Sequence, residues 1–300
     1  MATFKQYIKH KHLFVMMIPG ILFYILFRYT PIYGLQIAFK DYFFEYGMFG
    51  SPWVGFDVFK DVFRMESFWQ VFRNTLIISG YQLIFGFPVP IIFALFLNEI
   101  RSVKFKKLVQ TVSYLPHFVS WVVLGGLFMQ FLSPSTGPIN ILLKSMGLNP
   151  IYFLADKRYF RGVLVATEIW KSMGWSSIVY IAAITGIDQD MYEAAYLDGA
   201  TRMQRIIHIT LPSIAPVINI MFIFAIGKII NDNFDQVFNL YSTPVYEVGD
   251  VISTYVYRSG LTQMQFSFST AIGLFKNIIS FTLVLFANFV TKKIGGEGIW

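Results

Sequence analysis

The feature that most constrains the fold is a series of long apolar segments separated by shorter polar ones. A helix needs roughly 20 apolar residues to cross the hydrocarbon core of a bilayer, because each residue adds only about 1.5 Å along the axis. Six segments reach or approach this length, which predicts spans over residues 13–38, 74–98, 108–132, 161–186, 213–231 and 268–290. We therefore expect an all-α fold, a polytopic bundle of six transmembrane helices.

The composition agrees with a membrane protein. Of the 300 residues, 55% are hydrophobic and 14% are charged, whereas charged residues make up about 25% of an ordinary soluble domain. The mean hydropathy is +0.56. The net charge of +7 comes from basic residues in loops between the spans and not from one basic face. Membrane topology explains this charge better than nucleic-acid binding does, so no nucleic-acid partner is expected.

Several kinds of chemistry are missing from the sequence. It contains no cysteine, which excludes disulfides and thiolate sites. It contains no G-x-x-x-x-G-K-[ST] phosphate loop, so we do not expect this chain to hydrolyse ATP. The four histidines are scattered and no H-E-x-x-H spacing occurs, so no metal site is predicted. We expect neither catalytic residues nor a cofactor in this chain.

Residues 190–212 lie between the fourth and fifth spans and are too polar to cross a bilayer. Gly199 predicts a left-handed turn that ends a first short helix, and Pro212 is expected to end a second one. Each helix is preceded by a capping-box spacing, namely Asp190 with Glu193 and Thr201 with Gln204. The segment therefore predicts a helix–turn–helix knob on one membrane face, which suits docking into a groove of another protein.

Three motifs in the knob carry a resemblance to a known family. Glu193-Ala194-Ala195, Asp198-Gly199-Ala200 and Ile209-Thr210-Leu211-Pro212 resemble the EAA loop of bacterial ABC importer permeases, although Ile206 stands where carbohydrate permeases often carry phenylalanine. In that family the loop forms a cytoplasmic coupling helix that docks into the ATPase. The resemblance implies coupling roles for Glu193, Ala194, Ala195, Asp198, Gly199, Leu211 and Pro212. It also implies that ATP and Mg²⁺ bind to partner ATPase subunits. Capping alone is the alternative role for Glu193 and Gly199.

The N-terminal half resembles one branch of this family. The stretches KHLFVMMIPG and RYTPIYGLQIAFKDY are similar to permeases that handle oligosaccharides and polysaccharide fragments. The resemblance implies a carbohydrate substrate and alternating access driven by a separate ATPase. It implies an extracellular or periplasmic solute-binding protein as a partner. It further implies a heterodimer with a second, homologous permease, in place of a homodimer.

Basic residues predict the orientation in the bacterial cell membrane. Six spans place both termini and the knob on one side, where lysines and arginines are packed densely near the span ends. The positive-inside rule then makes residues 1–11, the C-terminus and the knob at residues 190–212 cytoplasmic. The whole of residues 1–300 is expected to form one multi-pass permease domain.

Polar and aromatic residues cluster in the fourth span and at the end of the fifth. Charged side chains at membrane depth are costly and mark either a transport pathway or a structural pair. Aromatic faces beside hydrogen-bonding groups also suit sugar rings. The predicted substrate pathway comprises Glu168, Trp170, Lys171, Trp175, Asn231, Asp232, Asn233, Asp235 and Gln236. The alternative, which the sequence leaves open for each residue, is an inter-helix pair or simple packing.

A second hypothesis comes from another class of transporter. An ion-coupled secondary carrier would use Glu168, Asp232 or Asp235 as its proton or sodium site. Such carriers often contain internal inverted repeats, and the sequence shows no convincing repeat. They also require no docking knob, so the importer permease is the favoured interpretation.

Overall fold

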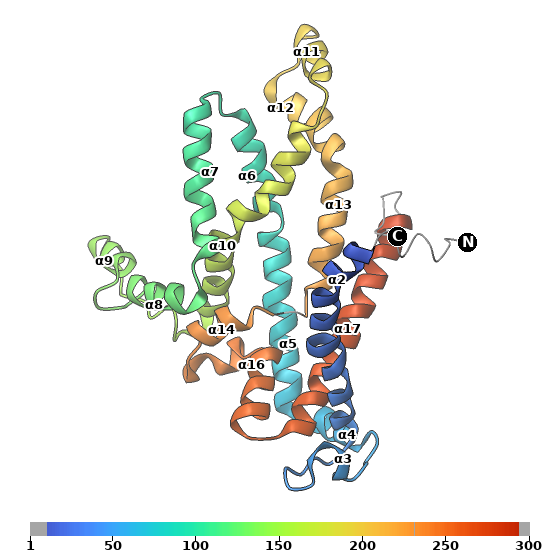
Figure 1. Cartoon of the computed structure of the whole chain (residues 1–300). Helices are drawn as coiled ribbons and strands as arrows, with labels where there is room; N and C mark the ends of the chain where they lie inside the picture. Colours follow the sequence, from blue (N-terminus) through green and yellow to red (C-terminus); the bar gives the residue numbers. More distant parts are fainter. Residues whose placement is uncertain (1–10, 231, 294–300) are drawn as a thin grey trace. The chain divides into compact units, whose positions relative to one another are not determined.

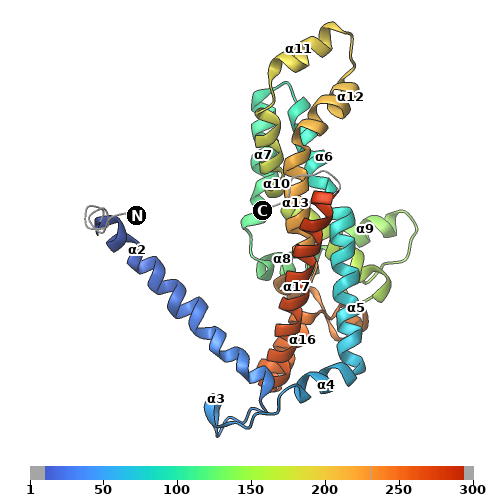
Figure 2. The ribbon, with the colours of Figure 1, turned by 90° about the vertical axis from the view of Figure 1, so that its right-hand side faces the viewer.

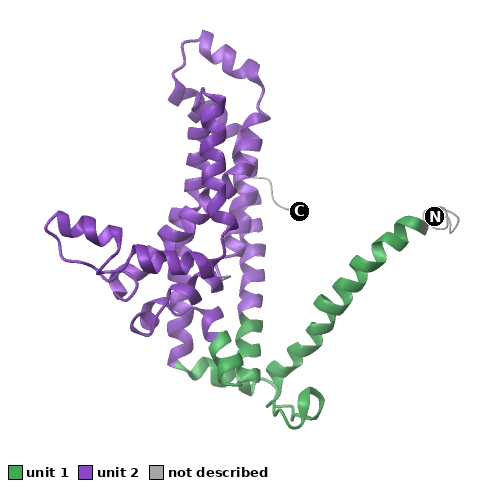
Figure 3. Ribbon diagram, turned by 60° about the vertical axis from the view of Figure 1, so that its left-hand side comes forward, with its two compact units in different colours: residues 1–65, 256–275 green, residues 66–255, 276–300 purple. Residues whose placement is uncertain are grey.

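The structure is a computed structural model that describes residues 11–230 and 232–293. These residues are largely helical and form no β-strand, apart from an isolated bridge between Lys40 and Trp53. This confirms the predicted all-α class. The chain divides into two compact units (Figure 3), with residues 1–65 and 256–275 in unit 1 and residues 66–255 and 276–300 in unit 2. The single permease domain over residues 1–300 stays a prediction.

Unit 1 contains the first apolar helix. Helix α2 (Lys11–Tyr24) continues through a π turn (Ile25–Tyr29) into a 3-10 segment (Thr30–Phe39). The run His12–Phe39 is long and apolar enough to cross a membrane, in agreement with the span predicted at residues 13–38. Two short helices follow it, α3 (Gly47–Gly50) and α4 (Asp57–Arg64).

The second apolar helix begins earlier than predicted. Helix α5 (Glu66–Tyr81), a π turn (Gln82–Gly86) and α6 (Pro88–Glu99) run together as one helix over Glu66–Glu99. The predicted start of this span at residue 74 is therefore wrong by eight residues. The reason is packing, since Phe68 and Val71 are buried in the first turns of α5. Pro88 follows the π turn closely, and the shifted hydrogen-bond register there lets the helix continue past the missing N–H.

The third predicted span is not a straight helix. Residues 108–132 are divided between α7 (Val103–Phe118) and α8 (Trp121–Phe131), whose axes differ by 104°. Pro116 lies near the end of α7, and the Ser120 hydroxyl accepts a hydrogen bond from Val123 N as the N-cap of α8. These local signals end one helix and start another. Helix α9 (Pro138–Ser145) follows in the next loop.

Helix α10 (Lys157–Thr185) is the central helix of unit 2, as Figures 1 and 2 show. It packs against α6, α7 and α13. Its approach to α7 is close, since a Cβ on Gly174 would lie 2.2 Å from the Ser113 carbonyl oxygen. Helix α10 covers the predicted fourth span, but it is too polar to count among the helices that are long and apolar enough to cross a membrane. The described part of the chain holds four such helices, or five with the bent α7–α8 pair, so the number of six spans stays a prediction.

The knob follows α10 and forms the tip of unit 2, at the end where α6 turns into α7 (Figures 1 and 2). Its first helix, α11 (Gln189–Leu197), is capped by the Asp188 side chain, which accepts from Asp190 N. The predicted N-cap at Asp190 is therefore wrong by two residues. Gly199 has a φ of +78°, which confirms the left-handed turn. Thr201 and Gln204 form the predicted capping box at the start of α12 (Arg202–Arg205).

Pro212 does not end the second knob helix, contrary to the prediction. Helix α12 continues through a π turn (Ile206–Thr210) into α13 (Leu211–Gly227), and Arg202–Gly227 is one helix long and apolar enough to span a membrane. Pro212 lies in the first turn of α13, directly after the π turn. That turn shifts the hydrogen-bond register, so the missing N–H of Pro212 does not interrupt the helix.

The C-terminal third contains short helices and one long one. These are α14 (Phe234–Leu240), a 3-10 turn (Thr243–Val245), α15 (Tyr246–Gly249), α16 (Ile252–Tyr257), a π turn (Arg258–Thr262) and α17 (Phe266–Lys293). Helix α17 is long and apolar enough for the predicted sixth span. One apolar core of unit 2 lies around α8, α10 and α14, and another lies between α6, α10 and α13. The second core supports the walls of the site described next.

Candidate substrate cavity and coupling knob

A cavity of about 400 Å³, here called the first cavity, lies within unit 2 between α10, α13 and the α5–α6 helix. Apolar side chains such as Phe87, Met221 and Phe224 form part of its wall. Its polar lining consists of Ser79, Gln82, Glu168, Ser172, Ser176, Tyr180, Lys228 and Asn233. This mixture of apolar surface and convergent polar groups is typical of a small-molecule site.

Helix periodicity explains how α10 builds one wall of this cavity. Glu168, Ser172, Ser176 and Tyr180 follow one another at intervals of four residues, which places them on one face of a helix. Of this row, only Glu168 belongs to the predicted substrate pathway. The i, i+4 spacing of the two serines and the tyrosine was the signal that could have identified the other three residues.

A second cavity, of about 470 Å³, shares part of its lining with the first. Glu168, Ser172 and Asn233 line both cavities. The Asn233 side-chain amide donates to Glu168 Oε2 at 2.7 Å. Asn233 also caps α14, since its Oδ1 accepts from Gln236 N. The structure therefore brings four of the predicted pathway residues together around the second cavity, namely Glu168, Lys171, Asn233 and Asp235. It places the hydrogen bond between Glu168 and Asn233 in the shared wall.

Lys171 lies on α10 one turn from Glu168, but its ammonium group is directed elsewhere. It donates to the carbonyl oxygens of Pro116, His117 and Val119, at 3.2, 2.8 and 2.7 Å. These carbonyls lie at the end of α7, where a positive charge also complements the helix dipole. Lys171 thus holds the bend between α7 and α8, and it lines the second cavity at the same time.

The two tryptophans of the predicted pathway make ring contacts and line neither cavity. Trp175 stacks on His117 with a centroid separation of 4.6 Å and an interplanar angle of 3°. Trp170 meets Phe128 edge to face at 5.7 Å. Both indole rings are partly exposed in the isolated chain. Their contacts are those of packing residues on α10.

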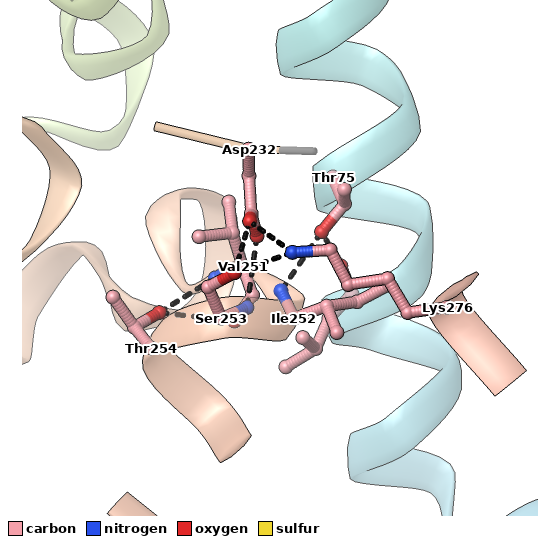
Figure 4. Close-up of polar contacts among 8 residues, drawn as sticks. Thr75, Asp232, Val251, Ile252, Ser253, Thr254 and Lys276 are labelled. Atoms are coloured by element: carbon pink, nitrogen blue, oxygen red, sulfur yellow. Dashed lines mark hydrogen bonds and ion pairs between the residues drawn. The ribbon is translucent and has the colours of Figure 1, made fainter. Parts of the chain in front are cut away.

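Asp232 lies in a closed polar cluster, which Figure 4 shows. Its carboxylate accepts from the Ser253 backbone N–H at 2.9 Å, from the Ser253 hydroxyl, and from Lys276 Nζ at 3.0 Å. The side chains of Asp232 and Lys276 are only 2% and 13% exposed. We call Asp232, Ser253 and Lys276 the Asp232 cluster. It joins the segment after α13 to α16 and α17.

The remaining predicted pathway residues lie in different surroundings. Gln236 is fully buried, and its amide donates to Leu164 O at 2.6 Å and to the Thr167 hydroxyl at 2.9 Å. Asp235 lines the second cavity. Asn231 lies outside the described residues. Of the predicted set, Glu168 and Asn233 line the first cavity, and Lys228 is the cationic residue there that the prediction had not selected.

The knob exposes large apolar side chains at its tip. Leu197 is 85% exposed and Tyr196 is 69% exposed. The Tyr192 hydroxyl bonds the Thr210 hydroxyl at 2.9 Å, which ties α11 to the helix that runs into α13. A groove of about 330 Å³ lies on the knob, lined by Ala195, Asp198, Gly199, Ala200, Gln204, Arg205, His208 and Ile209. Such a surface suits a protein partner.

The described residues include apolar helices long enough to cross a bilayer, a cavity with a partly polar lining, and an exposed knob. Together these features define a membrane transport protein. The chain belongs to the family of binding-protein-dependent transport system inner membrane components, whose model matches residues 86–295. It is therefore the permease subunit of an ABC importer and not an enzyme, and ATP hydrolysis resides in a separate subunit. This confirms the family that the knob motifs predicted. The family assignment gives no support to an ion-coupled carrier.

Relatives extend the similarity to the full length of the chain. Protein LplB of Bacillus subtilis (strain 168) is 43% identical over 300 residues, which is 100% of this chain and 93% of LplB. The polygalacturonan/rhamnogalacturonan transport system permease protein YteP of the same organism is 43% identical, covering 98% of this chain and 91% of YteP.

A solved structure agrees with the fold over the whole chain. It is the crystal structure of a bacterial alginate ABC transporter in complex with an alginate pentasaccharide-bound periplasmic protein. One of its chains superposes with a TM-score of 0.91 and 42% identity, covering 100% of both chains.

Proposed function

We propose that this permease moves an oligosaccharide across the bacterial cell membrane by alternating access. The observation that carries the proposal is the first cavity, where hydroxyl, amide and charged groups face a hollow that also has aromatic and aliphatic walls. Sugars offer hydroxyls at their rim and C–H groups on their faces, so they match such a lining. Similarity to YteP, a polygalacturonan/rhamnogalacturonan transport system permease protein, and to the alginate transporter supports the same substrate class.

The knob is proposed to couple this cavity to ATP hydrolysis. Arg202–Gly227 forms one continuous helix that begins in the knob, and its distal part contributes Met221, Phe224 and Ala225 to the cavity wall. A movement of the knob by an ATPase therefore reaches the cavity without crossing a loop. In this proposal Glu193, Ala194, Ala195, Asp198 and Gly199 form the docking helix and turn. Leu211 and Pro212 begin the part of the helix that transmits the movement.

The proposed topology has six spans with the knob and both termini in the cytoplasm. Two features support it: the knob lies at the end of unit 2 where α6 turns into α7 (Figure 1), and that turn carries a cluster of basic residues. The cluster comprises Arg101, Lys104, Lys106 and Lys107. Basic residues near span ends favour the cytoplasmic side. The α7–α8 pair and the polar helix α10 then supply the third and fourth spans.

The proposed assembly contains two different permeases, two ATPase subunits that bind ATP and Mg²⁺, and a binding protein that delivers the sugar from outside. The test is sugar-stimulated ATP hydrolysis in liposomes, with this chain purified together with its partner subunits. Glu193, which is exposed on α11, is changed to Lys. Glu45→Lys, at an exposed carboxylate outside the knob, is the matched control.

We expect the sugar-loaded binding protein to stimulate hydrolysis by the wild type and by Glu45→Lys. Glu193→Lys is expected to lose stimulation by roughly tenfold or more, as happens when an anchor of an interface is reversed in charge. Stimulation that survives Glu193→Lys contradicts the coupling role of the knob. Uptake that follows a proton or sodium gradient, with no ATPase in the purified assembly, contradicts the importer itself.

A further inference from the structure

We propose that Lys228 recognises a carboxylate of the substrate, so that the transported saccharide is acidic. This inference rests on the proposed function, because it assigns a charge to the saccharide that the first cavity holds. Lys228 lies directly after α13 and lines the first cavity together with Glu168 and Asn233. Its side chain is exposed toward this hollow and forms no ion pair with any residue in the described part of the chain.

The other lysines near this cavity have partners. Lys276 pairs with Asp232 at 3.0 Å, and Lys171 donates to three carbonyl oxygens at the end of α7. Asp232 lies four residues after Lys228 and was its nearest acidic neighbour in the sequence. The structure shows that the Asp232 carboxylate is occupied by Ser253 and Lys276 instead. Lys228 is therefore left with its charge available to a ligand.

The carboxylate in the cavity wall, Glu168, has a hydrogen-bond partner within the chain. The Glu168 carboxylate accepts from the Asn233 amide at 2.7 Å. It also shares the face of α10 with Lys171, one turn away, which supplies a positive charge nearby. Lys228 is thus the charged group of the first cavity that has no hydrogen-bond or ion-pair partner in the described part of the chain. An unpaired charge is costly at membrane depth, and a carboxylate on the cargo would offset that cost.

The chemistry of the lining fits an acidic sugar. A lysine ammonium has three donors and forms charge-assisted hydrogen bonds with a carboxylate. Ser79, Gln82, Ser172 and Ser176 offer hydrogen-bonding groups for sugar hydroxyls, and Phe224 offers an aromatic face for C–H groups. A neutral saccharide would use the same hydroxyl contacts but would leave Lys228 without a counter-charge. The site therefore discriminates by charge, through one residue.

The experiment compares acidic oligosaccharides with neutral versions of the same molecules. Oligosaccharides of alginate and of polygalacturonan are used intact and after reduction of their carboxylates to primary alcohols. ATP hydrolysis is measured against saccharide concentration for the complete assembly in liposomes, with one binding protein throughout. The variants are Lys228→Gln, Lys228→Arg and, as a matched control at an exposed lysine of α9, Lys144→Gln. The preference of the binding protein cancels when acidic-to-neutral ratios are compared between variants.

We expect Lys228→Gln to lower the acidic-to-neutral ratio of kcat/KM by roughly tenfold to a hundredfold, the range for losing a hydrogen bond to a charged group. Lys228→Arg should retain the preference, and Lys144→Gln should match the wild type. Equal stimulation by acidic and neutral saccharides in the wild type overturns the inference, as does an unchanged ratio in Lys228→Gln. Either result leaves the oligosaccharide permease intact. If no saccharide of either kind stimulates hydrolysis, the proposed function itself fails.

A second measurement applies if the binding protein delivers no neutral saccharide to the permease, so that no acidic-to-neutral ratio can be obtained. Equilibrium dialysis of the acidic oligosaccharides against the assembly without binding protein gives their affinity at low and high salt. Affinity that falls with salt in the wild type and is insensitive to salt in Lys228→Gln supports recognition of charge. If Lys228 only complements the carboxyl end of α13, the Lys228→Gln variant should melt at a lower temperature than the wild type and show the same salt dependence of affinity. That result also overturns the inference.

Discussion

The Asp232 cluster and the first cavity are two polar regions built from the same short stretch of chain, and they differ in closure. Asp232 is 2% exposed, and its carboxylate is saturated by Ser253 and Lys276. Lys228, four residues earlier, faces a hollow of about 400 Å³. A polar group whose partners lie within the chain stabilises the fold. A polar group that faces an open cavity is available to bind a substrate.

This difference separates two roles that the sequence alone does not distinguish. Residues 231–236 form one polar cluster at the end of a predicted span when only the sequence is considered. The structure divides it among a buried ion pair at Asp232, an internal amide at Gln236 and the cavity wall at Asn233. Loss of a closed group is expected to lower stability. Loss of an open group is expected to change transport instead.

The largest effect on stability is expected for Lys276→Met, which breaks the Asp232 cluster. The variant leaves the Asp232 carboxylate buried without a counter-charge, which costs about 3–5 kcal/mol when one partner of a buried pair is removed. The melting temperature of the detergent-solubilised assembly measures this loss. Lys144→Met, at an exposed lysine of α9, is the control and should melt with the wild type.

A double variant shows whether the loss comes from the stranded charge. Asp232→Asn combined with Lys276→Met removes both charges, and we expect it to recover part of the stability. Wild-type stability in Lys276→Met alone would show that the Asp232 cluster is not closed. The comparison with the cavity would then lose its basis.

Much of the helical architecture was predictable because hydrophobic length and turn chemistry are local. Four of the predicted apolar spans, the left-handed Gly199 and the capping box at Thr201 agree with the structure. Proline misled the prediction at Pro212, because a preceding π turn lets the helix continue. The residues that line the cavity were predictable in part. Glu168 and Asn233 were selected, but the partners of Asp232 come from α16 and α17, far along the chain.

A smaller loss of stability is expected for Lys171→Met, which removes the donor from three carbonyl oxygens at the end of α7. Unsatisfied polar groups of this kind cost about 1–3 kcal/mol. The bend of 104° between α7 and α8 should also become more variable. The chain has no cysteine, so single cysteines at the exposed positions Val112 and Met129 can carry spin labels. The distribution of distances between the labels measures the bend.

Lys171→Arg keeps a charged donor in the same position and should retain most of the stability. A label distribution in Lys171→Met as narrow as that of the wild type would show that the bend is set by Pro116 and Ser120 alone. Lys171 would then belong with Lys228, as a residue whose charge is available to a ligand in the second cavity. The comparison between closed and open regions would have to be redrawn at that residue.

The smallest stability effect is expected for Trp175→Ala, and this variant separates the two roles proposed for the indole. Trp175 is 44% exposed, and its ring stacks on His117 at 4.6 Å. Such aromatic pairs contribute about 0.5–1.5 kcal/mol beyond their buried area, so the melting temperature should fall slightly. Because Trp175 lines neither cavity, saccharide uptake should fall in proportion to the folded assembly and no further. Trp175→Phe, which keeps an aromatic ring, should restore both. Uptake that falls tenfold while the melting temperature is unchanged would instead place this ring in the substrate pathway, as the sequence had suggested.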